Sequence, residues 1–141
     1  MVELIRIGQV EVQFLETGQE TGGALDMFEV TVPPDAKVLV AHHHRDYDET
    51  IYGLCGTLTW TLKGERREVG PGETHFIPRG AVHHFANLHG ETAHSLAVLT
   101  PGLLGPGYFR DLAALIVPGS PPDLGRIREV MLRYGLVPVP C

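Results

Sequence analysis

The feature that most constrains the fold is an alternation of apolar and polar residues through about the first hundred residues. Neighbouring side chains of a β-strand point to opposite faces, so a period of two is typical of strands with one buried face. Gly- and Pro-rich turn signals separate the alternating segments, without helical crossovers. We expect strands at 2–7, 10–14, 25–32, 37–44, 49–54, 57–62, 74–77, 82–87 and 94–99. The pattern predicts an all-β, antiparallel barrel or jelly roll.

The period changes after residue 101, where two short amphipathic helices are expected at 107–116 and 122–135. Ser120 is the expected N-cap of the second helix, and Gly135 its stop. One apolar stripe runs along both helices and consists of Phe109, Leu112, Ile116, Leu124, Ile127 and Met131. We therefore expect a barrel over 1–104 and a helical cap over 105–141 that packs on it within one domain.

The composition and charge of the chain argue against several classes of binding partner. With 141 residues and a net charge of -6, the chain favours one domain and argues against a nucleic-acid surface. No apolar run approaches membrane-spanning length, and the start lacks the continuous apolar core of a signal peptide. The two cysteines give no disulfide framework. We expect a cytoplasmic protein that binds neither nucleic acid nor membrane.

Histidine is the one compositional excess, with eight in the chain. In the run AHHHRDYDE, His42 and His44 share a strand face, and a hairpin at 45–48 would return Glu49 toward them. His83, after a Pro-x-Gly turn, offers a third imidazole. This donor set suits one divalent transition metal per chain, such as Fe, Mn, Ni or Zn, better than Ca or Mg. The competing interpretation is a solvated surface patch.

These segments resemble the cupin superfamily. The first fits H-x-H-x4-E-x6-G at His42, His44, Glu49 and Gly56, with Ala36 where the family has an earlier glycine. The second fits G-x5-P-x-G-x2-H-x3-N at Gly72, Pro78, Gly80, His83 and Asn87. The resemblance implies a single-domain jelly-roll barrel with motifs at 42–56 and 72–87. It also implies a metal ion held by His42, His44, Glu49 and His83.

Strand parity gives an expected pocket around the metal. With Glu49 inward, Ile51 and Gly53 also point inward, and Phe85 shares the face of His83. The residues expected to line a ligand pocket are Tyr47, Ile51, Gly53, Trp60, Phe76 and Phe85. Plain barrel core, or packing for Tyr47, is the alternative. His43 and His84 should face away from the metal, while His75, His89 and His94 lack ligand spacing.

Cupins host several activities, so the fold leaves function open. The looser resemblance to small quercetin-dioxygenase-like cupins favours a metal-dependent dioxygenase acting on a small enolic, phenolic or diketone substrate. Glu49 would then bind the metal or accept a substrate proton. The alternatives are a non-catalytic metal- or small-molecule-binding module and a redox-silent isomerase or hydrolase. A homodimer formed through 2–7 and 10–14 is also expected.

Overall fold

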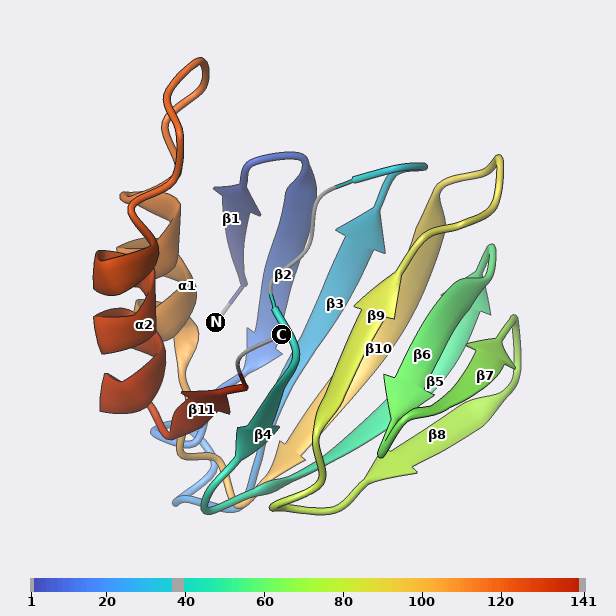
Figure 1. Ribbon diagram of the computed structural model, residues 1–141. Coiled ribbons are helices and arrows are strands. Elements are labelled where there is room, and N and C mark those ends of the chain that lie inside the picture. The colour runs from blue at the N-terminus through green and yellow to red at the C-terminus, as the bar shows by residue number, and fades with distance from the viewer. Residues whose placement is uncertain (1, 37–39, 140–141) are drawn as a thin grey trace.

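The computed structural model describes residues 2–36 and 40–139, over which two antiparallel sheets face each other as the walls of a barrel (Figure 1). The larger sheet has the order β1-β2-β3-β10-β5-β8. Its strands are Glu3–Ile7, Val10–Glu16, Asp26–Val32, Ala93–Thr100, Asp48–Cys55 and Thr74–Ile77. The smaller sheet has the order β11-β4-β9-β6-β7. Its strands are Leu136–Pro138, His42–His44, His83–Ala86, Leu58–Leu62 and Glu65–Val69. This is the jelly-roll, mostly β architecture that the alternation predicts.

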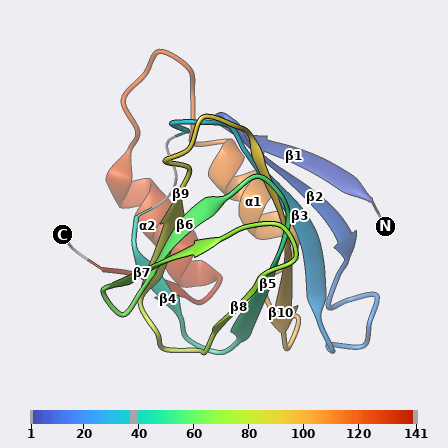
Figure 2. The same cartoon turned by 90° about the vertical axis from the view of Figure 1, so that its right-hand side faces the viewer.

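Two helices lie at the side of the barrel away from β7 and β8 (Figures 1 and 2). Helix α1 spans Pro106–Ala113 and contacts β1, whereas α2 spans Leu124–Arg133 and contacts β11. The N-cap of α2 is Asp123, whose carboxylate accepts from the Arg126 N–H, so the expected cap at Ser120 is wrong. Gly135 follows the helix with a φ of 83°, as a stop residue should. No helix among the described residues is long and apolar enough to span a bilayer.

Two strands of the structure, β7 and β11, were not predicted from the alternation of apolar and polar residues. Strand β7 has the sequence ERREV, whose first four residues are exposed, so it carries no apolar period. Strand β11 has three residues and follows a helix directly. Within the expected strand 37–44 the structure has a strand only at His42–His44: Val40 and Ala41 lie outside it, and 37–39 lie outside the described residues. Both missed strands are edge strands, where pairing does not require a regularly buried face.

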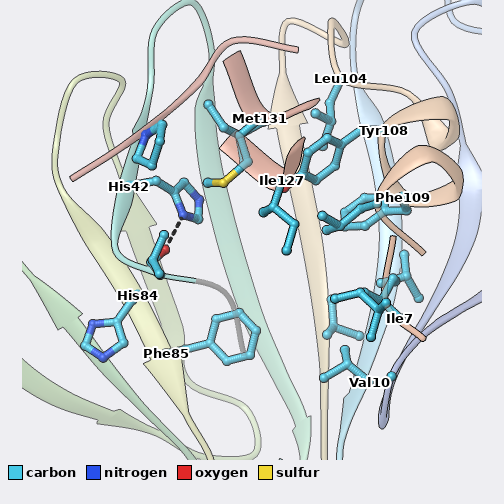
Figure 3. A pocket seen from close by; sticks show the side chains of 18 of the residues that line it. Ile7, Val10, His42, His84, Phe85, Leu104, Tyr108, Phe109, Ile127 and Met131 are labelled. Carbon is cyan, nitrogen blue, oxygen red and sulfur yellow. Dashed lines mark hydrogen bonds between the residues drawn. The ribbon is translucent and has the colours of Figure 1, made fainter. Parts of the chain in front are cut away.

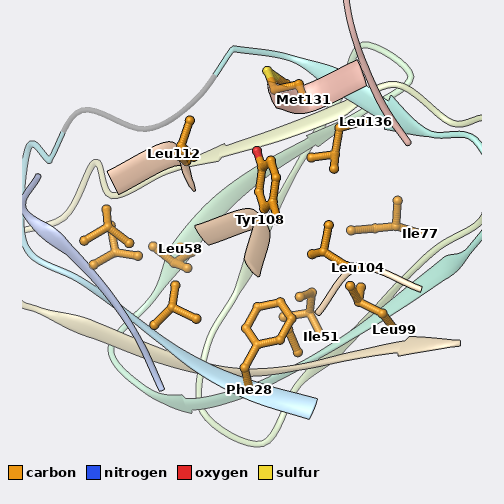
Figure 4. Packing of buried hydrophobic residues seen from close by; sticks show 14 of the residues in the cluster. Phe28, Ile51, Leu58, Ile77, Leu99, Leu104, Tyr108, Leu112, Met131 and Leu136 are labelled. Carbon is orange, nitrogen blue, oxygen red and sulfur yellow. The ribbon is translucent and has the colours of Figure 1, made fainter. Parts of the chain in front are cut away.

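The hydrophobic core joins both sheets to the helices (Figure 4). Phe28, Ile51 and Leu99 come from the larger sheet, and Leu58 from the smaller one. Tyr108, Leu112 and Met131 complete this core from the helices, and each is at most 1% exposed. The helices are therefore part of the packed interior.

A buried carboxylate fixes the approach to α1. Asp26 accepts hydrogen bonds from the backbone N–H groups of Gly18, Leu104 and Gly105, at 2.8, 3.0 and 3.1 Å. These bonds join β3 to the loop that precedes α1. Since a buried carboxylate is stable only when hydrogen bonded, the clamp sets where α1 begins.

Candidate metal centre

Three imidazoles from two neighbouring strands converge inside the barrel. His42 and His44 lie on β4, and His83 lies on β9 directly opposite His42. One ring nitrogen from each histidine lies within 4.8 Å of the others. The ring centroid of His83 is 4.7 Å from those of both His42 and His44. The structure thus brings together the three histidines that the sequence motifs single out.

Backbone carbonyls orient two of these rings. Nδ1 of His42 lies 2.9 Å from the Val40 carbonyl, and Nδ1 of His83 lies 2.9 Å from the Ala81 carbonyl. A carbonyl only accepts, so each Nδ1 carries a proton, which leaves each Nε2 as the ring nitrogen available to a metal. Metal-binding histidines are typically held in this way by a hydrogen bond from the second ring nitrogen.

Tyr47 supports the third ring. Its ring centroid lies 4.6 Å from that of His44, and its hydroxyl donates to the Tyr134 carbonyl at 3.1 Å. Nδ1 of His44 is buried without a hydrogen-bond partner among the described residues. Tyr47 itself is buried and packs behind His44. Its position fits a packing role, the alternative that the sequence left open.

Burial keeps two of the imidazoles neutral. Burial lowers the pKa of His42 to about 4, helped by the nearby His83. Burial also lowers the pKa of His44 to about 3, against the opposing influence of Glu49. A neutral imidazole presents a free lone pair at neutral pH, which is the form that binds a metal.

Glu49 contacts the three-histidine group through His83. It lies on β5 in the facing sheet, is 8% exposed, and places Oε1 3.5 Å from Nε2 of His83. Burial acts to raise the pKa of Glu49, but the hydrogen bond from His83 and the nearby histidines outweigh it and lower that pKa. Burial acts to lower the pKa of His83, yet its hydrogen bond and charge interaction with Glu49 raise it. Glu49 therefore stands beside the three-histidine group, which does not include it.

The donor set fits a first-row transition metal. Three imidazoles with an adjacent carboxylate are the ligands that Fe, Mn, Ni and Zn accept in proteins. The buried Nδ1 of His44 and the carbonyl-oriented rings of His42 and His83 agree with this use. These residues can hold a metal, and the donor set leaves its identity open.

A cavity of about 730 Å³ opens from the histidines into the space between the sheets and the helices (Figure 3). His42, His44, His83 and Glu49 form part of its wall. Of the expected pocket residues, Ile51, Trp60 and Phe85 also line it. Most of the remaining wall is aliphatic or aromatic, which suits an apolar ligand.

Three expected pocket residues lie elsewhere. Phe76 is 54% exposed on the outer face of β8, one residue out of phase with the buried His75 and Ile77. Gly53 is inward, but a Cβ there would lie 2.0 Å from the Gly70 carbonyl oxygen. Its missing side chain therefore makes room for a neighbouring backbone. Tyr47, as described, packs behind His44. The pocket expectation for Phe76 and Gly53 is thus wrong.

The other histidines take separate positions. His75 is buried, and its Nδ1 lies 3.5 Å from Arg67 Nη1. His94 meets Thr31 at 3.1 Å, and His89 lies 3.3 Å from a Glu68 carboxylate oxygen. His84, the neighbour of His83 on β9, is half-buried and also lines the cavity, and it is not part of the three-histidine group.

The helices supply a wall that sequence reasoning left out of the pocket. Tyr108, Leu112, Ile127 and Met131 all line the cavity. The apolar stripe along the two expected helices was the available signal. It indicated only a packing surface, and whether that surface contacts core or borders a cavity depends on how far the helices stand from the sheets.

Comparison with known proteins agrees with this geometry. The family model described as "Cupin domain" matches residues 28–99. An uncharacterized protein of Aquifex aeolicus (strain VF5) is 36% identical over 71 residues, which are 50% of this chain and 58% of that relative. The chain thus spans less than two thirds of that relative's length.

Solved structures show the same fold. KdgF from Halomonas sp. superposes with a TM-score of 0.62 at 19% identity, covering 70% of this chain and 86% of its own. A structure from Thermotoga maritima, described as a predicted oxalate decarboxylase, gives a TM-score of 0.64 at 22% identity. That likeness covers 72% of this chain and 92% of the other. Since both histidine-bearing segments fall inside the matched residues, the chain belongs to the cupin domain family.

Proposed function

We propose that this cupin is a metal-dependent dioxygenase acting on a small, largely apolar substrate with an enolic, phenolic or diketone group. The observation that supports this proposal best is the position of the three-histidine group on the wall of a 730 Å³ cavity lined mainly by apolar side chains. A substrate in this cavity would present its oxygen-bearing end to the histidines. The apolar remainder would lie against residues such as Phe28, Phe85 and Leu112.

The charge of the cavity argues for an uncharged substrate body. Arg128 on α2 is the single Lys or Arg among the described residues that line it. Apart from the metal that the histidines would hold, a small dianion would find one cationic partner in this wall, and an unpaired charge in an apolar site is strongly disfavoured. The oxalate in the description of the Thermotoga maritima structure therefore suits this cavity poorly.

Glu49 supplies the acid–base chemistry in this proposal. Its carboxylate is buried, has a lowered pKa and so stays ionised at neutral pH. Placed beside His83, it can accept the proton that an enol or phenol loses on binding. A divalent metal held by the three histidines would supply Lewis-acid and redox chemistry at positions left open to ligands.

Oxygen consumption tests the proposal directly. Protein prepared without affinity metal and loaded separately with Fe(II), Mn(II), Ni(II) or Zn(II) would be incubated with catechols, flavonols and β-diketones in an oxygen electrode. We expect one O2 consumed per substrate with at least one redox-active metal, and none with Zn(II) or with His44→Ala. Binding without oxygen consumption under every metal would instead favour a ligand-binding module. Turnover with Zn(II) would favour a redox-silent enzyme.

A further inference from the structure

One arginine lies on the apolar face of α2 that borders the cavity. The residues of this face stand at helical positions i, i+3, i+4 and i+7 and are Leu124, Ile127, Arg128 and Met131. All four line the cavity, and Figure 3 shows Ile127 and Met131 among the side chains around it. Arg128 therefore stands on the cavity side of α2, where an apolar residue would continue the stripe.

The exposed residues that line the cavity mark its opening. Arg128 and Leu124 are exposed, whereas Ile127 and Met131 on the same face are buried. Further exposed lining residues come from the segment before α2 and from the turn between β1 and β2, and they include Val117, Ser120, Pro122, Gly8 and Gln9. Arg128 thus lies at the opening of the cavity and not in its interior.

Arg128 has no acidic partner within the described chain. None of the described residues forms a hydrogen bond or an ion pair with its guanidinium. Other arginines of the helices are paired, since Arg110 binds Glu3 at 2.7 Å and Arg133 lies 3.6 Å from an Asp111 carboxylate oxygen. The guanidinium of Arg128 is therefore available to an anion from outside the chain.

The charges of the cavity wall determine where a ligand anion is tolerated. Among the described lining residues, Glu49 is the single carboxylate and Arg128 the single guanidinium. Glu49 is buried beside His83, whereas Arg128 is exposed at the opening. A negative group on the outer end of a ligand would meet Arg128 and stay away from Glu49, while the apolar body crosses the cavity between them.

We propose that Arg128 is a specificity-determining residue that binds a carboxylate at the outer end of the substrate. The substrate class is then a monocarboxylic acid with an apolar body, whose enolic, phenolic or diketone group lies at the histidines. A carboxylate matches one guanidinium, because the two planar groups form two parallel hydrogen bonds, whereas a phosphate dianion would keep an unpaired charge. This inference rests on the proposed function in placing the substrate in this cavity.

The alternative role for Arg128 is to cover apolar surface. Arginine often lays its methylene stem along apolar side chains and keeps its charge in water. The two roles differ in one measurable respect, because only carboxylate binding makes the affinity for a ligand depend on the ligand's charge.

Two probes of nearly the same shape measure this dependence. Naphthylbutanoic acid and naphthylbutanamide differ in one negative charge at neutral pH. Their dissociation constants would be measured by fluorescence titration with the full chain, freed of metal by a chelator so that the carboxylate cannot bind a metal ion. The proteins compared are the wild type, Arg128→Gln, Arg128→Lys and the control Arg126→Gln. The control removes a charge from an exposed position of the same helix outside the described cavity lining.

We expect Arg128→Gln to lower the affinity for the acid relative to the amide by roughly three- to tenfold. Arg128→Lys should keep part of the preference, because it retains the charge and loses the paired hydrogen bonds. Arg126→Gln should keep the wild-type ratio. Added salt should reduce the wild-type preference toward that of Arg128→Gln, since salt screens a pair at an exposed site. All three variants should melt close to the wild type, because both arginines are exposed.

An unchanged ratio in Arg128→Gln would overturn the proposal and leave Arg128 as cover for apolar surface. An equal fall in Arg126→Gln would also overturn it, because the preference would then reflect the general charge of the helix. A cavity that takes neither probe would do the same. Neither metal nor oxygen enters this measurement, so failure here is distinct from failure of the dioxygenase proposal.

Discussion

His42 of β4 lies directly opposite His83 of β9, and this is the one register pair between those strands in the described chain. The two histidine-bearing segments therefore meet at the candidate metal centre. The other edge of β4 is held by β11, which pairs Leu136, Val137 and Pro138 with the three histidines of β4. Strand β11 is thus a structural support for two of the candidate metal ligands.

Removing β11 should weaken the metal centre. In a chain ending at Arg133, β4 loses its three pairs with β11 and the hydrogen bond between the Arg45 N–H and the Gly135 carbonyl. Since supporting contacts tune ligand orientation, we expect metal affinity to fall by roughly ten- to a hundredfold. Competition with a fluorescent chelator measures this, and circular dichroism checks that the sheets persist. Unchanged affinity in a folded truncation would show that β11 has no such role.

Hydrogen bonds between Asp48 and Arg79 join the two histidine-bearing segments, 42–56 and 72–87, at the protein surface. Asp48 accepts hydrogen bonds from the backbone N–H, Nε and Nη2 of Arg79, at 2.8, 3.2 and 3.2 Å. These hydrogen bonds hold the pKa of Asp48 below its usual range. A lowered folded-state pKa stabilises the fold above the unfolded value of about 3.9, and this contribution disappears as pH falls through the folded value.

Asp48→Asn should therefore destabilise the protein slightly at neutral pH and not in strong acid. The effect is small because both side chains are partly exposed and salt screens their attraction. Urea unfolding of both proteins across this pH range measures the difference in the free energy of unfolding. A difference that stays constant down to acid pH would mean that the carboxylate charge is not involved.

Glu49 should matter more for turnover than for metal retention. Three imidazoles already form the close group, and Glu49 stands beside it through His83. In Glu49→Gln we expect metal content to stay near that of the wild type while turnover of an active substrate falls about a hundredfold or more. Elemental analysis and oxygen consumption would be measured on the same preparations. Joint loss of metal and activity would make Glu49 a required ligand.

We propose that the protein is a homodimer paired through its amino-terminal strands. Strand β1 lies at the edge of the larger sheet, and its Leu4 is 55% exposed. An uncovered edge strand favours pairing with a second chain. Light scattering at micromolar concentration should give twice the chain mass, and Leu4→Lys should lower it. A monomeric wild type would remove the proposal.

The sequence was most informative where residues repeat with a fixed period. Nine expected strands correspond to strands of the structure, because a half-buried strand must alternate. Strand β7 has no such period, and β11 is too short to show one. The N-cap is Asp123 and not Ser120 because α2 begins at Leu124, two residues later than expected.

For the candidate site, too, the sequence predicted the residues that follow a local pattern and missed those placed by contacts between distant segments. Spacing identified His42, His44 and His83, since strand parity and the motifs both act locally. The cavity wall could not be read in this way. The missing side chain of Gly53 makes room for the backbone of Gly70, which is distant in the sequence. Tyr108 lies on helix α1, whose start is held by the hydrogen bonds of Asp26. Such contacts between distant segments leave no periodic trace in the chain.

Metal content tests the central claim most directly. Wild type, His44→Ala, His83→Ala and the control His94→Ala, which alters a histidine bonded to Thr31 outside the site, would be purified without affinity metal and analysed for transition metals. The account predicts about one metal per chain in the wild type and the control, and loss of most of it in the two ligand variants with the sheets intact. Equal metal content in His44→Ala, His83→Ala and the wild type would contradict it.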